Sequence, residues 1–439
     1  MPTPCLPLQN HDLCCRCGAC AALCPVGAIG LADDGYPRLA AEVCRSCGLC
    51  DEICPGQTVD FTALYRQVFP DDDETVDFDG LVRAAWIGHA ADDDARRRGA
   101  SGGVVTAILA SMMAQGQVDA CLVTRMKADQ PWRAEAFIAT TPDELWASQS
   151  SRYQIVPVNR LVAEILRLPG RVTAVTLPCQ AHGLRMMMKK LPRLGEKIHY
   201  IVGLFCGGAL ESFFVPELLA ANGLRHEHIG AFQFRGGDWP GQMRAILPDG
   251  ATRPLHYSNY KDGLYNYVIS LYMPPRCQTC LDGAAEFADI SVGDAWGRDR
   301  GGHYRDPANS KVLIRTERGA ALIAHALQAG AVVGDFVADR RLWATPPMQK
   351  KRKTIYAPLR LSRLRQKGIP VPTYILNNDR LWPQVGVGDI VRERGVSFLL
   401  LLGQSPLARR LILGFLTSKL AKPIIRWRSW MKKRRQSQK

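Results

Sequence analysis

Two cysteine runs near the N-terminus share the spacing C-x2-C-x2-C-x3-C-P and lie 30 positions apart. Their eight cysteines are Cys14, Cys17, Cys20, Cys24, Cys44, Cys47, Cys50 and Cys54. In duplicated runs of this spacing, three cysteines of each run bind one [4Fe–4S] cluster and the fourth, before proline, binds the other. We therefore predict two clusters, with the ligand sets Cys14, Cys17, Cys20, Cys54 and Cys44, Cys47, Cys50, Cys24.

Other roles fit these cysteines less well. A structural zinc site takes a CxxC pair from each of two places, not a triple followed by Cys-Pro. Disulfides would need an exported protein, and residues 1–13 lack the basic start and the apolar stretch of a secretory signal. Gly18 and Gly48 lie where each loop must turn closely around the metal. We expect reduced thiols and a cytoplasmic protein.

Four further cysteines, Cys179, Cys206, Cys277 and Cys280, lie in the middle of the chain. The first two each follow a strand-like run, and the last two form a CxxC pair. Because strand ends meet at one edge of a sheet, the four thiols can converge. The residues alone leave other interpretations open, since buried free cysteines are common and a lone CxxC is as often a zinc site or a thiol pair.

The region after residue 82 must position these four cysteines, and it alternates strand-like with helix-like runs. Val172–Leu177 and Ile198–Phe205 are predicted strands, and Gln180–Lys190 and Glu211–Ala221 are predicted helices. This alternation is typical of α/β structure. We predict an α+β or α/β fold class, with a small ferredoxin-like domain for two [4Fe–4S] clusters followed by a larger mixed α/β region.

Composition divides the chain into six segments. They are a two-cluster ferredoxin domain (1–57), an acidic linker (58–81), the two parts of the α/β region (82–170 and 171–345), a peripheral extension (346–395) and a basic amphipathic tail (396–439). The linker assignment rests on the acidic run Asp71–Glu74.

The formal net charge of +15 is concentrated in the tail, where residues 396–439 hold eleven Lys or Arg and no acid. The rest is close to neutral, so we expect no nucleic-acid partner.

Trp427 and Trp430 alternate with cations, a pattern typical of a segment on an anionic membrane surface at the inner face of the membrane. A solvated tail and a partner-docking helix remain alternatives. No charge-free apolar run of 18 or more residues occurs, so no membrane-spanning helix is predicted.

Several stretches, taken in order, resemble one known family. They are Gly99-Ala-Ser-Gly-Gly-Val-Val-Thr106, Leu177-Pro-Cys-Gln-Ala-His-Gly-Leu-Arg185, Gly203-Leu-Phe-Cys206 and Cys277-Gln-Thr-Cys-Leu-Asp282 through Ala288-Asp-Ile-Ser-Val-Gly-Asp294. Over roughly residues 82–335 the chain resembles the beta subunit family of hydrogenases and dehydrogenases that use the deazaflavin coenzyme F420. That family includes ferredoxin-dependent hydroxymethyl and divinyl chlorophyll reductases.

The resemblance implies FAD and a third [4Fe–4S] cluster, held by Cys179, Cys206, Cys277 and Cys280. Cys5, Cys15 and Cys121 then remain as ordinary thiols. It also implies an oxidoreductase that passes electrons from a ferredoxin or a reduced deazaflavin, through the clusters, to FAD and an organic substrate. The alternative is an electron-relay subunit of a hydrogenase or dehydrogenase without a substrate of its own.

The candidate flavin contacts lie in two glycine-rich turns. Ser101, Gly102 and Gly103 precede a helix, where free backbone N–H groups suit a phosphate, although a plain helix start is the simpler reading. Arg235, Asp238 and Trp239 lie in the segment 234–241 and are placed to contact a flavin or substrate, unless this segment is a simple hairpin.

The catalytic residues are not identified by the sequence. His182 and Arg185, beside Cys179, are candidates to donate a proton or to hold an anionic flavin. A structural histidine with satisfied hydrogen bonds is an equally good interpretation of His182.

Overall fold

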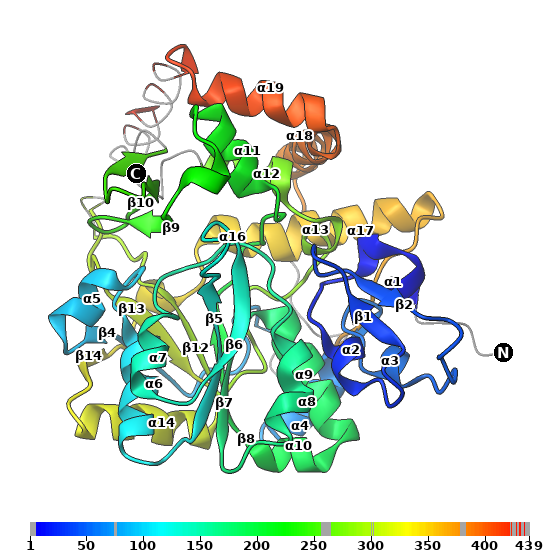
Figure 1. The fold of residues 1–439 in the computed structure, drawn as a ribbon, viewed down its shortest axis with the longest axis vertical. Coiled ribbons are helices and arrows are strands. Elements are labelled where there is room, and N and C mark those ends of the chain that lie inside the picture. Colours follow the sequence, from blue (N-terminus) through cyan, green and yellow to red (C-terminus); the bar gives the residue numbers. More distant parts are fainter. Residues whose placement is uncertain are drawn as a thin grey trace.

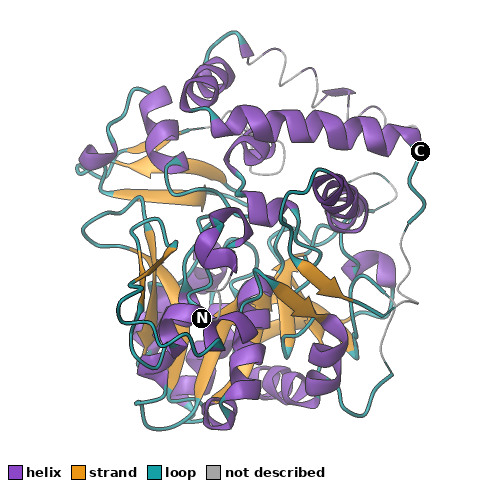
Figure 2. Ribbon diagram, turned by 90° about the vertical axis from the view of Figure 1, so that its right-hand side faces the viewer, coloured by secondary structure: helices purple, strands orange, loops and turns teal. Residues whose placement is uncertain are grey.

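The computed structural model describes residues 6–73, 77–255, 265–299, 301, 303–377, 383–421, 423, 427, 430, 431 and 434 (Figure 1). A large twisted sheet with helices on both faces occupies the lower half of the molecule in Figure 1, and the N-terminal module lies beside it. A smaller sheet and the C-terminal helices lie above the large sheet, and Figure 2 shows the same two levels from the side.

The large sheet contains eight strands in the order β14-β4-β13-β12-β8-β7-β5-β6. Their bounds are β14 Val332–Phe336, β4 Ala84–Ala90, β13 Ser310–Ile314, β12 Ile290–Asp294, β8 Ile198–Leu204, β7 Val172–Thr176, β5 Ala120–Met126 and β6 Ala134–Ala139. Neighbours from β12 through β8 and β7 to β5 are parallel, and the other neighbouring pairs are antiparallel. The carboxyl ends of β4, β12, β8, β7 and β5 therefore share one edge.

Helices cover both faces of this sheet with apolar side chains. On one face, α6 (Val104–Ala114) and α14 (Glu317–Gln328) pack with Trp86 of β4 and Val312 of β13. On the other, α9 (Pro178–Lys190) packs with Ile201 of β8. The remaining helices near the sheet are α5 Asp93–Arg98, α7 Pro142–Trp146, η2 Val158–Leu161, α8 Val162–Ile165, α10 Pro192–Lys197 and α15 Arg340–Trp343.

The predicted mixed α/β class is confirmed, with small shifts in element bounds. The strand expected at Val172–Leu177 ends at Thr176, and the helix expected from Gln180 begins at Pro178, which needs no N–H partner in a first turn. The helix expected at Glu211–Ala221 is α11 (Phe214–Ala221).

The N-terminal module repeats one backbone shape twice. Gly18 and Gly48 have φ of +87° and +77° at the starts of α2 (Ala19–Leu23) and α3 (Leu49–Glu52). Two residues before them, Arg16 and Ser46 both have φ of +52°. The module also holds α1 Leu6–Gln9, η1 His11–Leu13, β1 Ile29–Leu31 and β2 Pro37–Leu39. The duplicated sequence thus folds as a duplicated loop, and the two glycines satisfy its left-handed turns.

The acidic linker predicted for 58–81 is wrong for its first half. Residues 58–69 form β3 (Thr58–Asp60) and α4 (Phe61–Val68), and Phe61 and Tyr65 are buried against Phe287. Aromatic and aliphatic side chains at helical spacing bury this segment, and the acidic run follows it. Residues 74–76 lie outside the described part of the chain.

A second, smaller unit sits above the large sheet. Its three-stranded sheet consists of β11 Thr252–Pro254, β10 Gln242–Ile246 and β9 Ala231–Gly236. Helix α11 packs on it together with α12 (Tyr265–Tyr272), in a core that includes Phe214, Phe234 and Val268. Two short helices, η3 His226–His228 and α13 Pro275–Gln278, flank this unit.

The segment expected to be a peripheral extension is an integral part of the fold. It contains α16 Pro347–Lys351, the π-helical turn η4 Arg352–Tyr356, α17 Ala357–Gln366 and β15 Thr373–Ile375. Ile355 and Leu361 are buried, and β15 pairs in parallel with β3. The extension therefore folds back onto residues 58–69, to which it supplies apolar side chains and a strand, and the N–H of Thr373 donates to the carbonyl oxygen of Gln57 at 2.7 Å.

The predicted tail boundary at 396 falls inside α18 (Val387–Gln404). Helix α19 (Pro406–Thr417) follows it and buries Leu413 in the core of the smaller unit. No single described helix is long and apolar enough to cross a membrane, although α18 and α19, bent by 111°, pass that test together by length and composition.

Candidate iron–sulfur and flavin site

The eight N-terminal cysteines line two separate cavities. One is lined by Cys14, Cys15, Cys17, Cys20 and Cys54, and the other by Cys24, Cys44, Cys47 and Cys50. The cavities thus group the two ligand sets expected from the spacing, with Cys15 as a fifth thiol in the first. No group of three described His, Cys, Asp or Glu side chains is close enough to hold a single metal ion. The donor set around each cavity, four thiols, fits a [4Fe–4S] cluster.

Backbone N–H groups already point at several of these sulfur atoms. The N–H of Arg16 donates to Cys14 Sγ at 3.3 Å, and the N–H of Ser46 donates to Cys44 Sγ at 3.4 Å. The N–H of Ala28 donates to Cys24 Sγ at 3.2 Å. Hydrogen bonds to sulfur stabilise its negative charge, so these loops are suited to hold thiolates.

The four further cysteines converge at the shared edge of the sheet. Cys179 lies in the first turn of α9 after β7, Cys206 follows β8, and Cys277 and Cys280 belong to the α13 turn. Cys277 and Cys280 interact electrostatically with both Cys179 and Cys206. Three loops thus place four thiols within electrostatic range of one another, and four thiols are the number of ligands that one cluster takes.

These four cysteines are partly buried. Burial raises the pKa of Cys206 to about 12, although the nearby Lys353 opposes the shift. Burial also raises the pKa of Cys277, and the N–H of Ala209 opposes it. A metal ligand must be deprotonated, so cations and N–H groups near the sulfurs favour the thiolate form.

Cys15 connects the first cavity to this group, which sequence reasoning did not anticipate. Its thiol interacts with both Cys17 and Cys179, and α9, which carries Cys179, packs on the same cavity: a Cβ atom at Gly183 would lie 3.5 Å from Cys17 Sγ. Those contacts hold the pKa of Cys15 well below its ordinary value. The N-terminal module and the sheet region thus meet at their sulfur atoms.

A buried arginine spans the same junction. Arg276 donates to the carbonyl oxygen of Pro55 at 2.8 Å and to the hydroxyl of Tyr374 at 2.8 Å. Burial would lower the pKa of Arg276, but Tyr374, Cys280 and Cys15 raise it overall. Because Pro55 follows Cys54, this single cation lies between the two groups of thiols.

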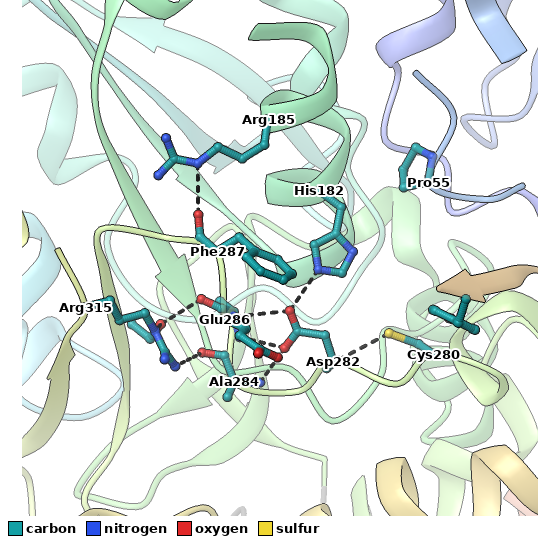
Figure 3. Close-up of polar contacts among 12 residues, drawn as sticks. Pro55, His182, Arg185, Cys280, Asp282, Ala284, Glu286, Phe287 and Arg315 are labelled. Carbon is teal, nitrogen blue, oxygen red and sulfur yellow. Dashed lines mark hydrogen bonds and ion pairs between the residues drawn. The ribbon is translucent and has the colours of Figure 1, made fainter. Parts of the chain in front are cut away.

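His182 and Arg185, the candidate catalytic residues, are both buried and bonded to protein groups (Figure 3). His182 Nε2 lies 2.9 Å from Asp282 Oδ2, and Arg185 Nε donates to the carbonyl oxygen of Phe287 at 3.0 Å. This arrangement favours the structural interpretation of His182, because both side chains tie α9 to the loop that follows Cys280.

Asp282 organises that loop. Its Oδ1 accepts from the N–H groups of Ala284 and Ala285, each at 2.9 Å, and its Oδ2 accepts from Glu286 at 3.2 Å. Burial alone would raise the pKa of Asp282, but His182 and these N–H groups lower it to about 2. Cys280 Sγ donates to the carbonyl oxygen of Asp282 at 3.2 Å, so the loop positions a candidate ligand.

Arg315 supports the same loop from below the sheet edge (Figure 3). It donates to the carbonyl oxygens of Asp79 and Ala284 and to Ser291 Oγ, at 2.7 to 2.9 Å. Neither Arg315 nor Asp282 was a predicted site residue. Asp282 lies inside a stretch that carried the family resemblance. Nothing in the sequence around Arg315 indicates its role before its hydrogen-bond partners are known.

The first flavin turn packs against the sheet edge between β4 and β13. Ser101 Oγ lies 2.7 Å from Ser310 Oγ, and the N–H of Gly102 donates to Ser310 Oγ at 3.1 Å. A Cβ atom at Gly102 would lie 2.7 Å from the carbonyl oxygen of Gly88, and one at Gly103 would lie 2.4 Å from that of Ala95. These glycines are therefore needed for packing, whatever the turn binds.

The second flavin turn is joined to the end of β12. Arg235 donates to both carboxylate oxygens of Asp294, at 2.8 and 2.7 Å, and Trp239 Nε1 donates to Asp294 Oδ1 at 3.2 Å. Trp239 also contacts the ring of Trp296 at 5.0 Å between centroids, while Asp238 is exposed. Both candidate turns thus reach the edge that carries Cys179 and Cys206, and Asp294 is the partner that the sequence did not reveal.

Comparison with known proteins agrees with these features. Two family models describe the "Coenzyme F420 hydrogenase/dehydrogenase, beta subunit": the model of its N-terminal part matches residues 85–163, and the model of its C-terminal part matches residues 170–335. A "4Fe-4S binding domain" model matches residues 7–30. Together the two beta subunit models cover more than half of the chain.

Named relatives are archaeal oxidoreductase subunits and enzymes. A subunit of the F(420)H(2) dehydrogenase of Methanosarcina mazei is 27% identical over 73% of this chain and 84% of its own length. The coenzyme F420 hydrogenase beta subunit of Methanothermobacter thermautotrophicus is 25% identical over 67% of this chain and 99% of its own length. The coenzyme F420-dependent sulfite reductase of Methanocaldococcus jannaschii is 26% identical over 71% of this chain. The match covers only 46% of the length of that enzyme.

A chain of the F420-reducing [NiFe] hydrogenase complex from Methanosarcina barkeri aligns with 66% of this chain and 92% of its own, at a TM-score of 0.49 and 20% identity. The two consecutive family models, the order of their motifs and the N-terminal module identify the class of protein. This chain belongs to the coenzyme F420 hydrogenase/dehydrogenase beta subunit family of oxidoreductases and carries an N-terminal 4Fe-4S binding domain.

Proposed function

We propose that this chain is an iron–sulfur flavoprotein that passes electrons from a ferredoxin or a reduced deazaflavin, via three [4Fe–4S] clusters, to FAD and an organic substrate. The observation that carries the proposal is the packing of α9, which carries Cys179, against the first cavity of the N-terminal module. A Cβ atom at Gly183 of α9 would lie 3.5 Å from Cys17 Sγ and 3.4 Å from Pro55 Cγ, so the first module set lies beside the helix that supplies Cys179.

Some residues of the chain would bind the clusters, and others would position these ligands. The sets Cys14/Cys17/Cys20/Cys54, Cys44/Cys47/Cys50/Cys24 and Cys179/Cys206/Cys277/Cys280 would hold the three clusters. When bound, the clusters supply one-electron transfer and FAD supplies the conversion between one- and two-electron chemistry. The Asp282 carboxylate, which accepts from three backbone N–H groups, would fix the loop that follows Cys280.

The FAD phosphates would lie at the Ser101–Gly103 turn, where α6 presents its N-terminus. Arg235, held by Asp294, and Trp239 would contact the flavin or the substrate. Asp238, exposed in the same turn, is assigned the same candidate role. His182 and Arg185 would act as positioning residues through their bonds to the 280–287 loop.

The alternative function is an electron-relay subunit that has no substrate of its own. The names of two relatives, one a subunit of a dehydrogenase and the other a beta subunit of a hydrogenase, favour this alternative. In that case a hydrogenase or dehydrogenase partner would take up or deliver the electrons. Copurification of a stoichiometric partner, without turnover of a deazaflavin by the isolated chain, would support it.

We also propose that the protein is cytoplasmic and that α18, α19 and the tail contact an anionic membrane surface. The outer faces of these elements expose Phe398, Leu401, Leu407, Leu411 and Trp427, with 58 to 69% of each side chain accessible. After residue 393 the sequence contains no acid. An apolar face flanked by Arg and Lys is what an anionic surface attracts.

The acids that precede this stretch are already neutralised within the fold. Asp389 pairs with Lys351 at 2.8 Å, and Glu393 pairs with Arg363 at 2.7 Å and Arg360 at 3.1 Å. The outer face therefore keeps its positive charge, which favours an anionic lipid surface over an electrically neutral partner.

The deciding experiment is the iron, sulfide and flavin content of anaerobically purified protein. Three clusters and one flavin per chain require about twelve irons, twelve sulfides and one FAD. About eight irons without flavin would refute the third cluster and the flavoprotein, and would leave the relay as the function.

A further inference from the structure

The segment that follows the family-matched region inserts a lysine beside the four thiols. Lys353 has only 3% of its surface exposed, although it belongs to the run Lys350–Lys353. A Cβ atom at Gly283 would lie 3.3 Å from Lys353 Cγ, 3.5 Å from its Cε and 3.3 Å from the carbonyl oxygen of Cys206. The lysine stem therefore runs along the loops that carry Cys206 and Cys280.

The neighbours of Lys353 hold the segment against the same loops. Gln349 Nε2 donates to the carbonyl oxygen of Gly283 at 3.3 Å, and that oxygen also accepts from the N–H of Cys206 at 3.0 Å. A Cβ atom at Gly207 would lie 3.7 Å from an Arg352 nitrogen. Two independent side chains thus fix the segment to the Cys206 loop, both of them just before Lys353 in the chain.

Lys353 is turned inward by an irregular stretch of helix. It lies in η4, the π-helical turn between α16 and α17. Pro358 follows in the first turn of α17 and lacks the N–H that an α-helix would direct to residue 354. A π-helical turn accommodates the missing backbone hydrogen bond and rotates the side chains that precede it. Such turns are frequently found at functional sites. Lys353, Ile355 and Tyr356 are accordingly buried together.

The charge of Lys353 acts directly on the candidate ligands. Its ammonium lies within electrostatic range of Cys280, Cys206 and Cys277. Four thiolates around a cluster place net negative charge in this buried site. The charge grows by one when the cluster accepts an electron, so a fixed cation favours the reduced form.

We propose that Lys353 raises the reduction potential of the cluster held by Cys179, Cys206, Cys277 and Cys280, so that electrons collect there. The inference rests on the third cluster of the proposed function. In the step concerned, the cluster that Cys14, Cys17, Cys20 and Cys54 would hold would lose one electron and the third cluster would gain it, with no bond made or broken. The lysine would make this transfer more favourable because its charge lies nearer the acceptor.

The test is a redox titration of the full chain, followed by electron paramagnetic resonance. Lys353→Met removes the charge at nearly constant length, and Lys353→Arg keeps it. Lys350→Met is the matched control, since Lys350 lies one turn earlier and is partly exposed. We expect the ratio of reduced to oxidised third cluster, at the wild-type midpoint, to fall at least tenfold in Lys353→Met. One unit charge within about 10 Å supplies that effect at an effective dielectric constant of about 20.

A tenfold change corresponds to a shift of about 59 mV for a one-electron couple. The module clusters, Lys353→Arg and Lys350→Met should keep wild-type potentials. A third-cluster potential that does not move in Lys353→Met with full iron content would overturn the inference and leave the proposed function intact. If Lys353→Met loses iron, Lys353→Gln is titrated in its place, and loss of iron there as well would assign Lys353 to cluster assembly and overturn the tuning role. Wild-type protein with iron for only two clusters would refute both this inference and the proposed third cluster.

Discussion

Replacing Asp282 with asparagine removes the buried carboxylate that organises the loop after Cys280. The carboxylate accepts three backbone N–H groups and faces His182. Asparagine has nearly the same shape but keeps one acceptor oxygen, so its amide N–H₂ group must face at least one of these donors. The loop would then hold Cys280 less firmly, because Cys280 lies two residues before the carboxylate that accepts the loop's three N–H groups.

The expected decrease in the free energy of unfolding follows from two contributions. Lowering the pKa of Asp282 from 3.8 to about 2 corresponds to about 2 kcal/mol in favour of the folded state. Each buried donor left without an acceptor costs about 1–3 kcal/mol. Since the two terms overlap, we expect Asp282→Asn to lower the free energy of unfolding by about 2–4 kcal/mol.

The assay is anaerobic urea unfolding monitored by tryptophan fluorescence, with Asp129→Asn, an exposed aspartate, as the matched control. The folded-state pKa of Asp282 is depressed, so its contribution is complete above pH 4 and disappears as the pH falls toward 2. The difference between wild type and Asp282→Asn should therefore be constant from pH 8 to pH 5. A difference below about 1 kcal/mol, or one equal to that of the control, would refute the account of this loop.

Three other changes test the proposed sites. Cys277→Ala should remove about four of about twelve irons and leave the module clusters, because one of four ligands is lost. Cys15→Ser should keep the full iron content, since Cys15 contacts the candidate ligands Cys17 and Cys179 without belonging to a ligand set. Replacing Leu407 and Leu411 together with serine should weaken binding to vesicles of anionic lipid more than tenfold, since each buried leucine contributes about 1.5–3 kcal/mol.

Matched controls distinguish these effects from general damage. Cys121→Ala changes a buried thiol of β5 outside every set and should leave the iron content unchanged. Serine at Val333 and Phe336, which are exposed on β14, should leave vesicle binding intact. Full iron in Cys277→Ala would exclude it as a ligand, and unchanged vesicle binding of the double leucine variant would exclude the membrane proposal. Such a result, combined with a dimer in solution, would assign the same face to a second copy of the chain.

The part of the site that sequence predicts best is the part built from local spacing. Cys14, Cys17 and Cys20 share one loop, so their spacing alone directs them to one cavity. The convergence of Cys179 and Cys206 was also predictable, because β7 and β8 are adjacent parallel strands that end at the same edge.

Contacts that depend on the return of distant segments were not predictable. Lys353 and Tyr374 reach the thiols only because residues 346–377 fold back across the molecule, and a run of four cations suggests a solvated surface. Helix α4 was missed for another reason. Phe61, Leu64 and Tyr65 have helical spacing, but the acidic run after them suggested a linker.

The parallel pairing of β3 with β15 helps to hold the N-terminal module in place. This restricts the ways in which the protein can exchange electrons with a partner protein. β3 begins four residues after Cys54, and residues 373–375 join it edge to edge. Arg276 donates to Pro55, Arg16 pairs with Glu211, and the N–H of Asn159 donates to the carbonyl oxygen of Cys17, so the N-terminal module is packed against the rest of the fold and is not a tethered carrier. A redox partner would therefore have to travel to the module, where Cys47 is the exposed cysteine of the cavity lined by Cys24, Cys44 and Cys50. Internal transfer then takes place over a fixed separation, so its rate should not respond to solvent viscosity, while the encounter with the partner should.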